Sequence, residues 1–415
     1  MTETHQDHYI IPLSNGIRAV HKHVGHTKVA HCAIMLDIGS RDEKTYQQGI
    51  AHFWEHMAFK GTQKRKAFHI LNRLESLGGE LNAYTTKEKI CFYASVLDDH
   101  IEKAIELLVD ITFNSTFPNK QIDKERHVIL EEMTMYEDSP EDAIQDEMDT
   151  LIFNGHQLGN NILGTRDSVG SFHKDNFLEF ISENLDTERI VFSSIGNQSH
   201  RKIERLVKKY LDEVPRKILT KNRQAVNGYS PNIRSVQKKI QQAHCAIGTR
   251  AFNIHDKERI PFFVLNNILG GPSMNSRLNL TIREKYGLVY NIDSHYQAYT
   301  DTGIFSIFYG TEPANLSRSI DLVFKEMKKL QNLTLGIRQL QMAKDQIKGQ
   351  LAMAEENTNS IMLMMAKSLL DLNRIQTLEV IFKQIDDITT ADLQDLANRV
   401  LQRDNMSILT FDPAV

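Results

Sequence analysis

The feature that most restricts the fold of this chain is an internal repeat. The pentapeptide AHCAI occurs at residues 30–34 and again at 243–247. Each copy lies in a strand-like segment, which is followed by a helix-like segment, a pair of strand-like segments, several helices and a closing strand. The length of 415 residues also exceeds what one hydrophobic core usually supports. The sequence therefore predicts two domains built on one plan.

The boundary between the copies is a polar segment, PRKILTKNRQAVNGYSP, at 215–231. It has Pro at both ends and an Asn-Gly pair inside, which is typical of linkers. We predict an α+β protein with homologous domains at 1–214 and 232–415, joined by this linker. Each domain is expected to contain a mainly antiparallel sheet packed with helices.

The composition is that of an ordinary soluble globular protein, with 41% hydrophobic and 25% charged residues. With 49 basic and 53 acidic residues, the net charge of -4 gives no reason to expect nucleic acid or an anionic membrane as a partner. No apolar run approaches the length of a membrane helix, and the start lacks the features of a signal or transit peptide. Cys32, Cys91 and Cys245 are widely spaced and odd in number, which argues against disulfides. We expect a reduced, cytoplasmic protein.

The first candidate for chemistry is HFWEH at 52–56. On a helix, His52 and His56 lie on one face and can bind one metal ion, with Glu55 on the adjoining edge. A catalytic zinc ion takes three protein ligands, and a nearby carboxylate can act as general base towards water. The order is that of the inverted zincin motif, HxxEH. The alternative is an ordinary helix with two surface histidines.

The repeat indicates that only the first copy carries this motif. GIAHFWEHMAFKG aligns without gaps with RIPFFVLNNILGG at 259–271. In this alignment Phe262 stands opposite His52, Leu265 opposite Glu55 and Asn266 opposite His56. The two domains are therefore expected to share a fold and differ in function.

A third metal ligand is expected in ERHVILEEM at 125–133, which has a helical pattern. Glu132 lies on one face with Val128 and Ile129, whereas Glu131 is rotated by about 100° towards solvent. A carboxylate on an apolar face is costly unless it is paired or binds a metal, which favours Glu132 as ligand. Glu125, one heptad earlier on the same face, is a candidate to orient the site. The alternative for Glu132 is a partly exposed acid at a helix edge.

Three further histidines, His21, His23 and His26, fall in a short predicted strand and turn. We expect them to be solvated, as is usual for scattered surface histidines. A second metal site at this place is the alternative.

HFWEH followed at a distance by ILEEM resembles the pitrilysin-like zinc peptidases, and so do FKGTQKR, LESLGGELNAYTTKE and ILGGPSMNSRL. The resemblance extends over essentially the whole chain. It implies a zinc endopeptidase with one Zn²⁺ per chain, in which His52, His56 and Glu132 bind the metal, Glu55 activates water and Glu125 supports the site. The short bacterial members and the mitochondrial processing peptidase subunits are two-domain halves that pair into a clamshell. The resemblance thus implies a homodimer that encloses peptides or unstructured segments.

The resemblance also implies two substrate-binding sites. Asn82 and Ala83, in GGELNAYTT, would lie on an exposed sheet edge that can accept an extended peptide as an added strand. Arg283 and Tyr290, in IREKYGLVY, match a pair that holds substrate near the metal, contributed by the second subunit of a composite active site. The alternatives are an interior strand, a surface Arg and a core Tyr. For the whole protein they are a non-catalytic structural subunit and a processing peptidase that depends on a partner chain.

Overall fold

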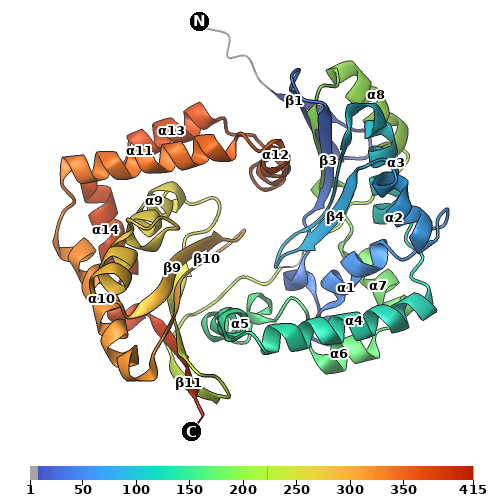
Figure 1. Ribbon diagram of the computed structural model, residues 1–415. Coiled ribbons are helices and arrows are strands. Elements are labelled where there is room, and N and C mark those ends of the chain that lie inside the picture. The colour runs from blue at the N-terminus through green and yellow to red at the C-terminus, as the bar shows by residue number, and fades with distance from the viewer. Residues whose placement is uncertain (1–7, 222, 415) are drawn as a thin grey trace, which may run out of the picture. The chain divides into compact units, whose positions relative to one another are not determined.

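The computed structural model describes residues 8–221 and 223–414, and the chain divides into two compact units. The first unit combines the chain up to Met133 with residues 160–223 and 354–375. The second combines residues 134–159, 224–353 and 376 to the C-terminal end. Each unit contains one β-sheet with helices packed against it (Figure 1).

The first sheet has six strands in the order β1-β2-β6-β3-β5-β4. In this order the strands are His8–Pro12, Arg18–His23, Ile190–Gly196, Val29–Leu36, Ile90–Leu97 and Glu80–Thr85. All neighbours are antiparallel except β2 and β6, which are parallel. The sheet is therefore mainly antiparallel, as predicted.

Helices cover both faces of this sheet (Figure 1). They are α1 (Ile50–Ala58), α2 (Ala67–Glu75), α3 (Ile101–Phe113), α4 (Asn119–Glu137, which continues past Met133), α6 (Arg166–Ser171), α7 (Lys174–Asn184), α8 (His200–Leu211) and α12 (Thr358–Leu372). On one face Met35 of β3 lies in an apolar cluster with Met362 of α12. On the other, Phe92 of β5 contacts Trp54 of α1, with ring centroids 6.4 Å apart. Side chains that alternate along the strands thus fill two apolar layers.

The second sheet has five strands in the order β7-β11-β8-β10-β9, namely Ile233–Lys238, Ser407–Pro413, Ala243–Ala251, Gly303–Thr311 and Val289–Ala298. Its helices are α5 (Pro140–Ile152), α9 (Arg259–Gly270), α10 (Leu316–Asn332), α11 (Ile337–Ala354, whose last residue falls in the first unit), α13 (Leu378–Asp386) and α14 (Thr390–Val400). A π-helical segment, Asn279–Lys285, lies between α9 and β9. With two mainly antiparallel sheets and their helices, the predicted α+β class is confirmed.

Strand order shows that the repeat is structural. Strands β7, β8, β9, β10 and β11 take the places of β2, β3, β4, β5 and β6, in the same chain order and with the same directions. The two AHCAI segments lie in the equivalent strands β3 and β8. The sequence of strand β7, IRSVQK, does not by itself predict a strand, because it is mostly exposed at a sheet edge and lacks a clear apolar alternation.

One helix from each half of the chain packs on the sheet of the other half. Helix α12, from the second half, covers Ala33 and Ile195 of the first sheet. Helix α5, from the first half, covers Ala246 and Phe411, which are the equivalent positions of the second sheet. The predicted domains at 1–214 and 232–415 are continuous stretches of the chain. Each compact unit, in contrast, also includes a helix from the other half.

Among its described residues, the predicted linker at 215–231 forms no helix or strand. Its first part is nevertheless fixed to the first unit. Lys221 Nζ lies 2.7 Å from the Asp37 carboxylate, and the buried Arg223 guanidinium lies 2.7 Å from that of Asp42. The segment up to Arg223 is thus part of the first unit, and the chain passes into the second unit again at residue 224.

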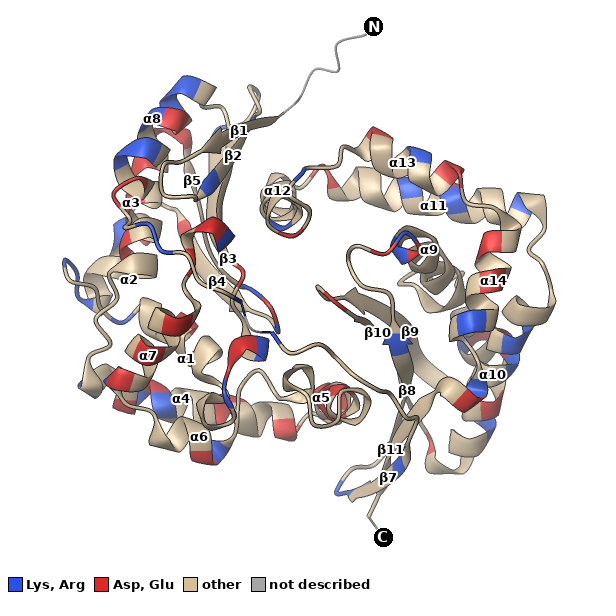
Figure 2. Ribbon diagram, turned by 180° about the vertical axis from the view of Figure 1, so that it is seen from behind, with Lys and Arg blue, Asp and Glu red and all other residues tan. Residues whose placement is uncertain are grey.

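Basic and acidic residues are interspersed along helices such as α3, α8 and α10 (Figure 2). Within the described residues, no helix is both long enough and apolar enough to cross a membrane.

The expectation that His21 is solvated is wrong. Its side chain is buried, with Nδ1 at 2.9 Å from Ser194 Oγ and Nε2 at 2.8 Å from the Gln198 carbonyl oxygen. Burial lowers the pKa of His21 to about 4, so the ring is neutral at neutral pH. His23 and His26 are exposed, as expected. The described residues contain one cluster suited to a metal, and these histidines are not part of it.

Candidate metal centre

Helix α1, which carries the HFWEH motif, is anchored in the core by its apolar side chains. Gly49 precedes it with φ 91°, a conformation that favours glycine. A side chain here would also place a Cβ 2.4 Å from the Leu163 carbonyl oxygen. Phe53 and Trp54 are fully buried, so the face opposite them is left for polar groups.

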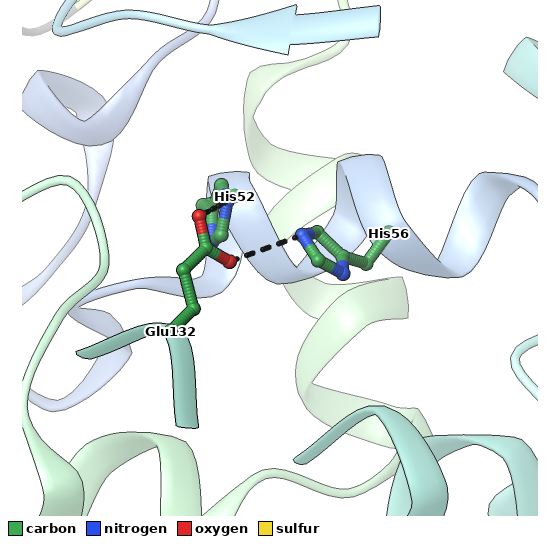
Figure 3. Close-up of side chains that lie close together, drawn as sticks. All are labelled: His52, His56 and Glu132. Carbon is green, nitrogen blue, oxygen red and sulfur yellow. Dashed lines mark ion pairs between the residues drawn. The ribbon is translucent and has the colours of Figure 1, made fainter. Parts of the chain in front are cut away.

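That face presents His52 and His56 to Glu132, which reaches them from helix α4 (Figure 3). One carboxylate oxygen of Glu132 lies 3.7 Å from His52 Nε2 and the other 3.6 Å from His56 Nε2. One ligand atom from each residue lies within 4.8 Å of the other two. The three residues predicted as ligands are thus brought together from segments far apart in the sequence.

The donor set fits zinc. Tetrahedral coordination with bonds of roughly 2.0–2.2 Å places ligand atoms roughly 3.4 Å apart, close to the separations of Glu132 from the two imidazoles. Burial, and to a lesser degree the neighbouring His56, lowers the pKa of His52 to about 3, which keeps its ring neutral as metal binding requires. Burial also raises the pKa of Glu132. A cation between the three residues would favour the charged carboxylate.

Glu55 lies on the same helix, at the edge of this group. Thr85 of strand β4 donates a hydrogen bond of 2.5 Å from its hydroxyl to Glu55 Oε2. Burial raises the pKa of Glu55, although this bond acts in the opposite direction. A carboxylate with a raised pKa is better suited to accept a proton from water near neutral pH.

Glu125 lies behind the second histidine and is buried. Its carboxylate is 3.3 Å from His56 Nδ1 and 2.8 Å from Lys60 Nζ. Burial alone would raise the pKa of Glu125, but the contacts with His56 and Lys60 outweigh it and the pKa is lowered. An ionised Glu125 can fix the orientation and tautomer of the His56 ring.

Sequence reasoning missed both Lys60 and Thr85. Lys60 follows His56 by four positions in FKGT, so helical spacing could have suggested it as a neighbour of the motif. Nothing in the sequence places Thr85 near Glu55, because that contact depends on how β4 packs on α1.

The prediction of which α4 residues are buried and which are exposed is confirmed in part. Glu131 is exposed and Ile129 is buried, as expected. Val128, expected on the apolar face, is 49% exposed. Glu132 therefore lies at the boundary between the buried and exposed faces of the helix.

Asn82 and Ala83 lie in β4, at the end of the strand order of the first sheet. They pair on one side only, with Tyr93 and Phe92 of β5. The alternative of an interior strand therefore does not hold for the described strands. This edge leads directly to Thr85 and, through it, to Glu55.

Arg283 and Tyr290 belong to the second unit and lie close to each other. The Arg283 guanidinium carbon is 5.9 Å from the centroid of the Tyr290 ring, a distance typical of a cation–π contact. The Tyr290 side chain is 89% exposed, so the alternative of a core tyrosine does not hold.

Two family models match the chain. Residues 18–166 match the model described as Insulinase (Peptidase family M16), and residues 171–347 match the model described as Peptidase M16 inactive domain. The first match contains all three candidate ligands and Glu55, and the second contains Arg283 and Tyr290.

Among similar curated proteins, YmxG of Bacillus subtilis (strain 168), named an uncharacterized zinc protease, is 32% identical over 390 residues, covering 94% of this chain and 95% of the relative. An uncharacterized zinc protease of Mycobacterium leprae is 30% identical over 400 residues, covering 94% of this chain and 88% of the relative.

Two solved structures share the fold. A crystal structure described as the peptidase M16 inactive domain from Pseudomonas fluorescens superposes with a TM-score of 0.92 at 17% identity, covering 98% of both chains. The structure of a protease from Helicobacter pylori superposes with a TM-score of 0.88 at 21% identity, covering 98% of this chain and 99% of that one.

Proposed function

Because the chain belongs to the insulinase family of peptidases, family M16, we propose that it is a zinc endopeptidase that cleaves peptides and unstructured polypeptide segments. Membership confirms the resemblance to the pitrilysin-like peptidases and supports a zinc metalloprotease. The observation that carries the proposal is the convergence of His52, His56 and Glu132 beside Glu55. One zinc ion per chain follows from this group, the one such cluster in the described residues.

Each residue of the site has a defined task in this proposal. His52, His56 and Glu132 hold zinc, which supplies Lewis acidity that acidifies water and polarises a carbonyl group. Glu55 accepts a proton from water and passes it to the leaving amine, while Thr85 holds one of its oxygens. Glu125, itself held by Lys60, orients the His56 ring.

The edge of β4 supports a preference for extended substrates. A peptide that adds to Asn82 and Ala83 as a further strand binds mainly through its backbone, so many sequences can be accepted. A folded domain cannot offer such a free strand. The same edge ends at Thr85, which would place the bound strand near the proposed base.

We extend the proposal to a homodimer with composite active sites that enclose the substrate. In the longer relatives, two such halves are joined, and the metal domain faces the last domain. Two separate chains would reproduce this if Arg283 and Tyr290 act on substrate held at the metal of the partner chain. The exposure of Tyr290 supports a role for its phenol in binding a substrate carbonyl or the oxyanion formed from it.

Purified protein, an unstructured peptide mixture and a stably folded domain test the main proposal. We expect cleavage of the peptides, its loss with a chelator, its return with zinc, and resistance of the folded domain until it is unfolded. No cleavage by a zinc-loaded chain would favour the non-catalytic structural subunit. Cleavage only after a second protein is added would favour the partner-dependent processing peptidase.

Co-expression of a Glu55→Gln chain with a Tyr290→Phe chain tests the composite site, provided each variant homodimer is nearly inactive. Shared sites give every mixed dimer one intact site, so activity returns. Mixed dimers isolated with two tags that stay as inactive as the parents would rule sharing out.

A further inference from the structure

Glu43 is a buried carboxylate outside the group of metal ligands, with only 2% of its surface exposed. Its two oxygens accept hydrogen bonds of 2.9 Å from the backbone N–H groups of Gly49 and Ala51. These donors lie at the start of helix α1. Burial raises the pKa of Glu43, and the two bonds act in the opposite direction. A buried carboxylate is costly, so its position at the start of the metal-binding helix requires an explanation.

The segment that carries Glu43 also binds the turn between β4 and β5. Ser40 N–H donates to the Thr86 carbonyl oxygen at 3.2 Å, and Arg41 N–H donates to that of Lys87 at 2.7 Å. A Cβ on Gly39 would lie 2.4 Å from the Thr86 oxygen, so glycine permits this close approach. Residues 39–43 are thus hydrogen-bonded to the turn that directly follows β4, the strand with the proposed substrate-binding edge.

These contacts link the strand β4 to the helix α1 beside the proposed site. Residues 39–43 join the end of β4 to the start of α1. Thr85, the last residue of β4, donates a hydrogen bond to Glu55 of α1. The strand and the helix are therefore held together at two points, one at the chemistry and one at Glu43.

The second unit supplies an internal comparison. In the gap-free alignment of α1 with α9, Pro261 stands opposite Ala51 and has no N–H to donate. Arg259, which stands opposite Gly49, donates its backbone N–H to the carbonyl oxygen of Asp256 at 3.2 Å. At the start of the helix that lacks metal ligands, one aligned position thus has no N–H, and the N–H of the other bonds to a backbone oxygen.

We propose that Glu43 is a positioning residue, which fixes the start of α1 so that His52 and His56 face Glu132 while Glu55 faces the edge of β4. This inference rests on the proposed peptidase function. A shift of α1 along its axis or a rotation about it would misplace the ligands and the base together. Glu43 acts through the helix backbone and touches neither metal nor substrate.

The variant that tests this is Glu43→Gln, which keeps the shape but replaces one acceptor oxygen by a donor amide. We expect kcat to fall by about tenfold or more, with KM for an extended peptide changed by less than about threefold. Binding of Co²⁺ to the chelator-stripped protein should weaken by about tenfold, and its visible absorption, which reports ligand geometry, should change. Glu179→Gln is the matched control, because Glu179 is a surface carboxylate bonded to Tyr46 Oη at 2.7 Å.

A double-mutant cycle with Ala51→Pro separates positioning from general damage. This change removes one donor, and Pro261 shows that the fold accepts proline at the aligned place. If both residues act through their shared hydrogen bond, the double variant should be no worse than Glu43→Gln alone. Fully additive losses would contradict the inference.

The outcomes distinguish this inference from the proposed function. A wild-type chain that binds Co²⁺ but cleaves no peptide overturns the peptidase, while the Co²⁺ affinity and spectrum still test Glu43. Wild-type kcat, affinity and spectrum in Glu43→Gln would overturn the positioning role. If Glu43→Gln fails to fold, Ala51→Pro alone decides by the same three readouts.

Discussion

Helices α1 and α9 occupy the same place in the two copies of the fold, yet α1 carries the candidate metal ligands and α9 carries apolar core residues. In α9, Phe262 is fully buried and meets the rings of Tyr296 and Phe305 at 4.9 and 5.6 Å. In α1, the aligned position holds His52, whose ring is buried beside His56 and near Glu132. The same scaffold thus accepts an aromatic core residue or a candidate metal ligand at one position.

The difference shows what the site costs the fold. Burial lowers the pKa of His52 and raises the pKa of Glu55 and Glu132, so each charged form is disfavoured there. In α9 the residue aligned with Glu55 is Leu265, which is fully buried. The first unit retains polar groups where the second gains apolar packing, so it forgoes that packing energy. A bound cation would offset this loss of stability.

The largest expected effect comes from cutting the chain after residue 223, which separates the two copies of the fold. A fragment of residues 1–223 lacks α12, and a fragment of residues 224–415 lacks α5, so each sheet would expose an apolar face. We expect neither fragment to unfold cooperatively alone, and co-expression to restore a folded complex. Circular dichroism during urea unfolding provides the measurement.

The matched control is residues 1–223 with residues 354–375 appended through a flexible linker, which supplies α12 to its own sheet. Cooperative unfolding of the plain 1–223 fragment, equal to that of the control, would show that the units do not depend on the exchanged helices.

The next effect is on the metal. His52→Phe places the α9 residue into α1, and we expect zinc to fall to background and peptide hydrolysis to fall by more than about 10³-fold. The protein should remain folded, because Phe262 is accepted at the aligned position. His69→Asn is the control, since His69 is an exposed histidine of α2. Zinc retained at one equivalent in His52→Phe would remove His52 from the ligand set.

A smaller effect concerns His21, whose equivalent in the second sheet is the exposed Ser235. The pKa of His21 is lowered from 6.5 to about 4, so the unfolded chain binds more protons than the folded one between these values. Stability is therefore present above pH 6.5 and falls as the pH drops towards 4, by on the order of 3 kcal/mol in total.

His21→Gln, which does not titrate, should reduce this acid-dependent loss in urea unfolding of chelator-treated protein. An equal loss of stability between pH 7 and pH 5 in both proteins would show that His21 is not responsible.

Helical periodicity within each segment was enough to select the three candidate ligands, whereas their convergence depends on the fold. Spacing places His52 and His56 on one face, and the same rule selects Glu132 over its exposed neighbour Glu131. The repeat likewise predicted which elements correspond, and the strand order confirms it.

What the sequence did not predict depends on long-range packing. The exchange of α5 and α12 and the bond from Thr85 to Glu55 join segments with no shared local pattern. His21 falls in a polar-looking strand, and nothing local indicates that Ser194 and the Gln198 carbonyl satisfy both ring nitrogens. Such partners are fixed only when the elements assemble.

The central claim, that Glu55 acts as base beside a zinc ion held by His52, His56 and Glu132, is tested most directly by measuring zinc content and peptide hydrolysis in Glu55→Gln. We predict one zinc per chain, as in the wild type, and a rate reduced by about 10²–10⁴-fold, because the metal remains and the proton acceptor is lost. His56→Ala, measured alongside, should lose both zinc and activity. Hydrolysis by Glu55→Gln at the wild-type rate would contradict the account.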